Sequence, residues 1–132
     1  MHLIYYVIFN IIIFEDKMNW KIEFYSDRVK QNIIKGWPKK IRTKFALITE
    51  LIEEFGPEEV GMPHVSPFGG GLFEIRAKGE EGIGRAIFCN TKGKVIVILN
   101  EFIKKTQKTP PRELELAKKR MVEVKKNEQK KT

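Results

Sequence analysis

The fold is decided by residues 72–104, which read LFEIRAKGEEGIGRAIFCNTKGKVIVILNEFIK. Apolar and polar side chains alternate over 72–78, which predicts a strand, and a second apolar-rich run at 82–89 predicts another. The third run, 94–102, contains five consecutive apolar residues and is typical of a central strand covered on both faces. Because short glycine-containing links join the three runs, we expect an antiparallel meander.

The flanking sequence predicts one more strand and three helices. The half-buried strand is expected at 20–25, and the helices at 28–35, 38–55 and 112–126. Residues 57–71 are rich in glycine and proline, so we expect a loop there. The prediction is therefore an α+β domain over residues 18–126 with a small antiparallel sheet of about four strands, an N-terminal helical hairpin and a C-terminal helix. A polar tail follows at 127–132.

The composition and the net charge indicate what kind of partner the protein binds. The chain has 132 residues, which suits one domain, and 25 lysines and arginines against 17 aspartates and glutamates give a net charge of +8. Such an excess attracts polyanions, so nucleic acid is the first candidate partner and an acidic protein the second. Cys89 is the only cysteine, which precludes an internal disulfide and fits a cytoplasmic protein. Two histidines and one cysteine, far apart, give no metal-ligand spacing.

The N-terminal stretch differs from the rest of the chain. Residues 2–14 read HLIYYVIFNIIIF, a run too short to span a membrane and without the features of a signal peptide. We interpret residues 1–17 as a mis-assigned extension upstream of a native start at Met18. An added edge strand and a membrane-associated segment are the alternatives.

Two further features have alternative interpretations. Basic residues occupy the first half of the predicted 38–55 helix and acidic residues the second half, an order that opposes the helix dipole. A functional basic surface would explain this order, but a solvated face is the more common cause. His64 lies in the predicted loop, where an ordinary exposed or hydrogen-bonded histidine is favoured over a catalytic one.

Two linked stretches resemble a known family. They are GLFEIRAKGEEGIGRAIF and VIVILNEFIKKTQKTPPRELELAKKRM, and they resemble the phage-derived, HigB-like branch of the RelE/ParE toxin superfamily. The resemblance covers about residues 18–126. It implies a RelE-like fold and the toxin of a type II toxin–antitoxin system. It also implies a ribosome-dependent mRNA endonuclease without metal or other cofactor, which inhibits translation. The implied partners are the ribosome, mRNA and a cognate antitoxin of helix-turn-helix type.

The resemblance also implies candidate site residues. Arg76 and Arg85 match basic positions that hold the scissile phosphate, and arginine grips phosphate oxygens with a planar fork. Lys104 and Lys105 match the basic position after the last strand, where a lysine could act as acid or base. The candidate RNA contacts are Lys78, Phe102 and Lys108.

These assignments have simpler alternatives, and the sequence differs from the family pattern at two places. Arg76 could be a solvated arginine, whereas Arg85 shares an apolar face and needs an acidic or phosphate partner. Glu74 stands where some relatives carry a basic residue, and the loop after the last strand lacks the tyrosine or histidine of several relatives. The alternatives are therefore a non-enzymatic, ParE-like inhibitor of DNA gyrase and an inactive antitoxin-binding remnant.

Overall fold

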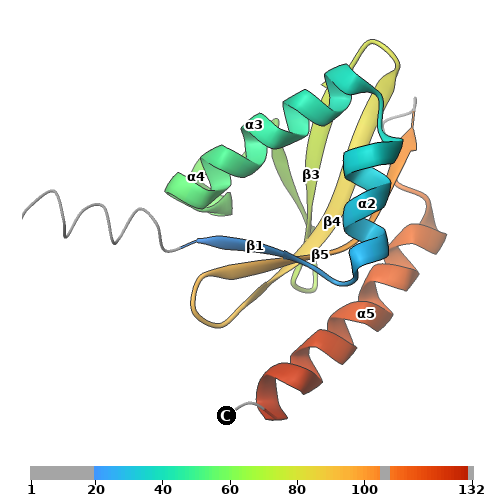
Figure 1. Cartoon of the computed structure of the whole chain (residues 1–132). Helices are drawn as coiled ribbons and strands as arrows, with labels where there is room; N and C mark the ends of the chain where they lie inside the picture. Colours follow the sequence, from blue (N-terminus) through green and yellow to red (C-terminus); the bar gives the residue numbers. More distant parts are fainter. Residues whose placement is uncertain (1–19, 105–107, 131–132) are drawn as a thin grey trace, which may run out of the picture.

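Five strands form one mixed sheet in the order β1-β5-β4-β3-β2 (Figure 1). The structure is a computed structural model that describes residues 20–104 and 108–130. The elements follow in chain order: β1 (Lys21–Phe24), α2 (Asp27–Gly36), α3 (Lys39–Phe55), α4 (Pro57–Val60), β2 (Val65–Gly69), β3 (Leu72–Gly79), β4 (Gly82–Thr91), β5 (Val95–Lys104) and α5 (Pro111–Lys130). The predictions made for residues 1–17 and for Lys105 lie outside the described residues.

The predicted meander is confirmed. Strands β3 and β4 pair antiparallel, as do β4 and β5. The pairing of Gly79 with Gly82 closes the first hairpin on a two-residue turn. The second hairpin turns at Gly93 and Lys94, which both have positive φ, 77° and 61°. Glycine adopts this conformation without a steric penalty, which explains its place in the turn.

The predicted sheet was wrong in strand number and in direction. Strand β1 runs parallel to β5, with Lys21 opposite Val95, so the sheet is mixed and not purely antiparallel. The expected loop at 57–71 instead contains the short helix α4 and the edge strand β2, which pairs with β3. Its Pro67 lacks an N–H, and an edge strand tolerates this because only one side is paired.

Helices cover both faces of the sheet. The apolar stripes of α2 and α3 pack on one face, where Ile33, Ile41 and Ile48 meet Ile75 and other strand residues. Helix α5 packs on the opposite face through Ala117, among side chains of β3, β4 and β5. The continuous apolar run of β5 therefore serves two cores, which confirms its prediction as a strand covered on both faces.

Polar contacts fix α5 against the sheet. Asn100 donates to the Glu113 carboxylate at 3.0 Å, and Arg120 donates to the Leu99 carbonyl at 2.6 Å. The Tyr25 hydroxyl donates to Glu123, and this hydrogen bond raises the pKa of Tyr25. The helix continues to Lys130, four residues beyond its predicted end. None of the helices in the described ranges is long and apolar enough to cross a membrane.

Candidate nucleic-acid interface

Strand register places the candidate basic residues on one face of the sheet. Directly paired residues of antiparallel strands point to the same face, and this face is the one that α5 covers further along. Two neighbouring rows cross β3, β4 and β5 there. The rows are Lys78–Ile83–Lys104 and Arg76–Arg85–Phe102. The structure thus brings together five of the seven residues singled out from sequence.

Arg85 is buried on this face of the sheet and belongs to a network of polar side chains. Its Nη1 donates to Glu74 Oε1 at 2.8 Å and to Thr109 Oγ1 at 3.4 Å. The Thr109 hydroxyl donates in turn to Glu74 Oε2 at 3.2 Å. Only 1% of Arg85 and 3% of Glu74 are exposed. Arg85 therefore has the acidic partner that its apolar surroundings require.

Arg76 shares the same carboxylate but reaches the surface. Its Nε lies 3.4 Å from Glu74 Oε1, and 21% of its side chain is exposed. Arg76 and Arg85 stand directly opposite each other across two strands. Glu74 therefore acts as a counterion to both guanidinium groups, while only that of Arg76 is open to a ligand.

Lysines surround this pair at the end of the sheet. Lys78 is exposed and Lys104 half-buried, and both flank Ile83 in the outer row. Lys108 is exposed beyond the end of β5, next to the buried Thr109. Phe102 is half-buried and pairs with Arg85, so it is not a freely presented ring. Lys105 lies outside the described residues.

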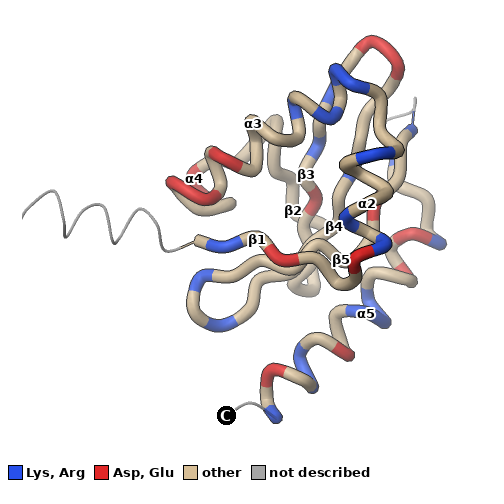
Figure 2. The backbone as a smooth tube through the Cα atoms, viewed as in Figure 1, with Lys and Arg blue, Asp and Glu red and all other residues tan. Residues whose placement is uncertain are grey.

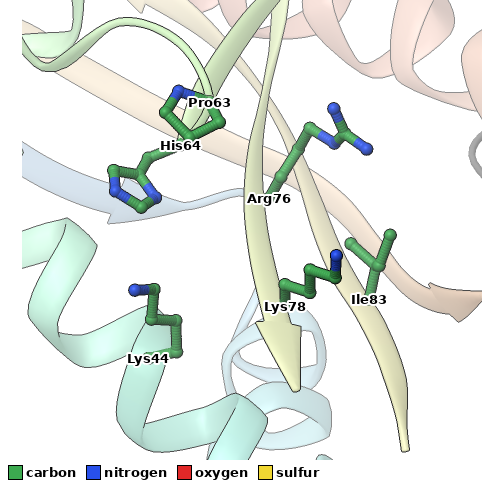
Figure 3. A pocket seen from close by; sticks show the side chains of 6 residues that line it. All are labelled: Lys44, Pro63, His64, Arg76, Lys78 and Ile83. Carbon is green, nitrogen blue, oxygen red and sulfur yellow. The ribbon is translucent and has the colours of Figure 1, made fainter. Parts of the chain in front are cut away.

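A cavity of about 460 Å³ opens beside this face at the edge of β3. Its lining residues come from α3, the segment before β2, β3 and β4: Lys44, Pro63, His64, Arg76, Lys78 and Ile83 (Figure 3). The backbone joins two of these parts, because the Arg76 amide donates to the His64 carbonyl at 2.8 Å. The cavity thus places the imidazole and three cationic side chains around one space.

The sequence alone gave no functional role to four residues of the polar network and the cavity. Glu74 appears in the sequence analysis only as a departure from some relatives, and Thr109 appears there only within the second stretch that resembles the family. Lys44 belonged to the basic half of α3 and His64 to a loop, with the simpler interpretation favoured for each. The charge order along α3 was the available signal, and Figure 2 shows its basic half beside β3 and its acidic half toward α4.

The remaining candidate reactive groups are the possible metal ligands and the thiol of Cys89. Within the described ranges, no group of three or more His, Cys, Asp or Glu side chains could hold a metal ion. Cys89 is buried in the core under α5, and burial raises the pKa of its thiol. A buried thiol with a raised pKa is a poor nucleophile, which agrees with its interpretation as a small core residue.

Together, the mixed sheet, the helices on both faces and the basic strand rows define a small basic α+β domain. The family model described as phage-derived protein Gp49-like matches residues 32–122, and the chain therefore belongs to this family. The assignment agrees with the phage-derived RelE/HigB-like resemblance of the sequence, while the HigB-like branch itself stays a prediction.

One solved structure and the curated proteins complete the comparison. A chain from the crystal structure of the archaeal RelE–RelB complex from Pyrococcus horikoshii OT3 is 22% identical. The match covers 69% of this protein and 100% of that chain, with a TM-score of 0.48. Among curated proteins, none matches this sequence.

Proposed function

We propose that this protein is the toxin of a type II toxin–antitoxin system and a ribosome-dependent mRNA endonuclease of the HigB-like branch. Membership of the Gp49-like family supports a toxin of this kind. The observation that carries the nuclease proposal is the pair of strand rows, which gathers Arg76, Lys78 and Lys104 on one face. A cluster of cations suits a substrate whose backbone carries one negative charge per nucleotide.

The reaction needs only the RNA and protein side chains. The ribose 2′-oxygen attacks the adjacent phosphorus, and the bond from phosphorus to the 5′-oxygen of the next nucleotide breaks. A base takes the 2′-OH proton and an acid returns a proton to the leaving oxygen. Positioned proton transfer contributes about 10²–10⁴-fold to such reactions. The products are a 2′,3′-cyclic phosphate and a free 5′-hydroxyl.

The exposed cations have distinct proposed roles. Arg76 holds the scissile phosphate, because its guanidinium is both anchored by Glu74 and partly exposed. Lys104 or Lys105 supplies the acid or the base, and Lys78 and Lys108 attract the flanking backbone. Phe102 is half-buried in the inner row, and its proposed role is to contact a base with the part of its ring that is exposed.

Arg85 is proposed to act through its neighbours. A phosphate could reach its guanidinium only by displacing Thr109 or Glu74, since the side chain is buried. We therefore assign it a positioning role: it fixes the Glu74 carboxylate, which in turn fixes Arg76. This revises the sequence-based expectation that Arg85 grips the phosphate directly.

The proposed partners follow from the same face. A cognate antitoxin, which we expect to be of the helix-turn-helix type, would inactivate the toxin by covering the basic rows with an acidic segment. Complementary charge speeds and orients such an encounter. The ribosome is the second partner, and the site of action is then the cytoplasm.

Primer extension on a reporter mRNA tests the proposal. The wild-type chain is compared with Arg76→Gln, with and without translating ribosomes. We expect ribosome-dependent cuts that fall by about 10²–10³-fold in Arg76→Gln, the usual cost of losing one charge-stabilising donor. Lys118→Gln is the matched control, since Lys118 is an exposed cation on α5. Arrested growth with intact mRNA, together with inhibited supercoiling by DNA gyrase, would refute the nuclease and favour the ParE-like alternative.

A further inference from the structure

The cavity at the edge of β3 has the composition of an anion site. Lys44, Arg76 and Lys78 line it together with His64, and none of its lining residues is acidic. Among the described residues, Lys44 and Lys78 take part in no ion pair, whereas Lys40 on the same helix pairs with Glu80 at 3.1 Å. Two cations thus line one cavity, and no described ion pair neutralises either of them.

The edge of β3 adds a backbone donor. Strand β2 pairs with β3 only as far as Val65 opposite Ile75, and the Arg76 amide still reaches the His64 carbonyl. Amides two residues apart on a strand point the same way, so the Lys78 amide is directed toward this edge beyond the start of β2. Backbone N–H groups at an open edge are suitable donors to phosphate oxygens.

The size and walls of the cavity indicate more than a lone phosphate. The volume of about 460 Å³ lies within the usual range of pockets for ligands larger than a phosphate ion. Pro63 and Ile83 supply apolar wall on which a base could lie. Figure 3 shows the Lys44 amine directed toward the His64 imidazole, so these two groups converge on one part of the space.

We propose that this cavity is a subsite that binds the RNA nucleotide next to the scissile phosphate. Lys44, Lys78 and His64 are the side chains that contact this nucleotide. The inference rests on the proposed function, because it takes RNA as the source of the nucleotide. Arg76 lines the cavity and also belongs to the basic rows, so it joins the subsite to the proposed point of cleavage. Lys44 and Lys78 hold the phosphate, and His64 donates a hydrogen bond to the sugar or base.

Histidine NMR signals give a direct readout of occupancy. The chain has two histidines, so comparison with His64→Gln assigns the His64 ring signals. We expect adenosine monophosphate to shift these signals saturably in the full chain. Lys44→Gln should weaken its binding on the order of three- to tenfold, the value of one charge-assisted contact at a partly exposed site. Lys39→Gln, an exposed neighbour on α3, should stay within about twofold.

A short oligoribonucleotide with a 2′-deoxy scissile unit tests RNA as the source. It should displace adenosine monophosphate, and the slope of log affinity against log salt should fall by about 0.7 in Lys44→Gln, one single-strand phosphate contact. The subsite proposal would be overturned if adenosine monophosphate did not shift the His64 signals. It would also be overturned if Lys39→Gln and Lys44→Gln weakened the binding of adenosine monophosphate equally. Adenosine monophosphate that the oligonucleotide cannot displace would overturn its assignment to RNA.

The two proposals fail separately. If adenosine monophosphate and the oligonucleotide bind the cavity but mRNA stays intact, the nuclease proposal falls and the subsite stands. If mRNA is cut and Lys44→Gln cuts with unchanged KM and kcat while His64 stays silent, the subsite falls and the nuclease stands. Circular dichroism of each variant verifies that the fold is intact.

Discussion

The substitution Glu74→Gln should destabilise the protein more than any single exposed charge change. Arg85 is 1% exposed and its described carboxylate partner is Glu74, at 2.8 Å. Removing the charge takes away the described carboxylate of a buried ion pair, and breaking such a pair typically costs about 3–5 kcal/mol in the free energy of unfolding. With a urea m-value of about 2 kcal/mol/M, the unfolding midpoint should fall by roughly 2 M.

Urea unfolding followed by circular dichroism measures this effect. Glu80→Gln is the control, because Glu80 also pairs with a cation but at an exposed site, where an ion pair is worth about 0–1 kcal/mol. The double variant Glu74→Gln with Arg85→Met should recover part of the loss, since it removes the buried cation as well. If Glu74→Gln shifted the midpoint no further than Glu80→Gln, the argument that Glu74 neutralises a buried arginine would be wrong.

Three further outcomes test the packing and the titrating groups. Gly84→Ala should cost about 1–3 kcal/mol in urea unfolding, because an added Cβ would lie 2.5 Å from the Trp37 ring, whereas Gly36→Ala, with open space around it, should be neutral or slightly stabilising. The Cys89 thiol should react with a thiol reagent at pH 8 only after denaturation, because burial raises its pKa; fast labelling of the native chain would contradict this. The pKa of Tyr25 is raised above 10.0 in the folded chain, so its contribution to stability should be full below pH 10 and lost as pH rises through the raised pKa. Unfolding of Tyr25→Phe across this range would expose the difference, and parallel curves for both chains would argue against it.

The local elements could be predicted from sequence because their signals are local. Alternation at β3, the five-residue apolar run of β5 and the apolar stripe of α3 each report on one element and its buried face. The direction of β1 could not be predicted in this way. Its four residues fit either direction, and the parallel pairing of Lys21 with Val95 is set by where α2 and α3 return the chain. Strand β2 could not be predicted because Pro67 and the glycines around it are typical of loops.

The sequence allows a prediction of which face of the sheet carries the basic residues, but not of which of these residues are buried. Alternation along β3 groups Arg76 with Lys78, and the cross-strand pairing of Arg76 with Arg85 puts all three residues on one face of the hairpin. Which of them is open to a ligand depends on Thr109, whose hydroxyl accepts a hydrogen bond from the buried Arg85. That contact joins residues 24 positions apart, and no periodic signal in the sequence marks it.

Glu74 explains how this face can hold so many cations. Two arginines directly opposite each other on paired strands repel, and a register that places them so is unfavourable unless a counterion lies between them. Glu74 lies two residues before Arg76 on β3 and therefore on the same face, and its carboxylate contacts both guanidinium groups. An acidic residue where some relatives are basic is therefore compatible with a phosphate-binding face. It neutralises the buried charge of Arg85 while Arg76, Lys78 and Lys104 keep the surface positive.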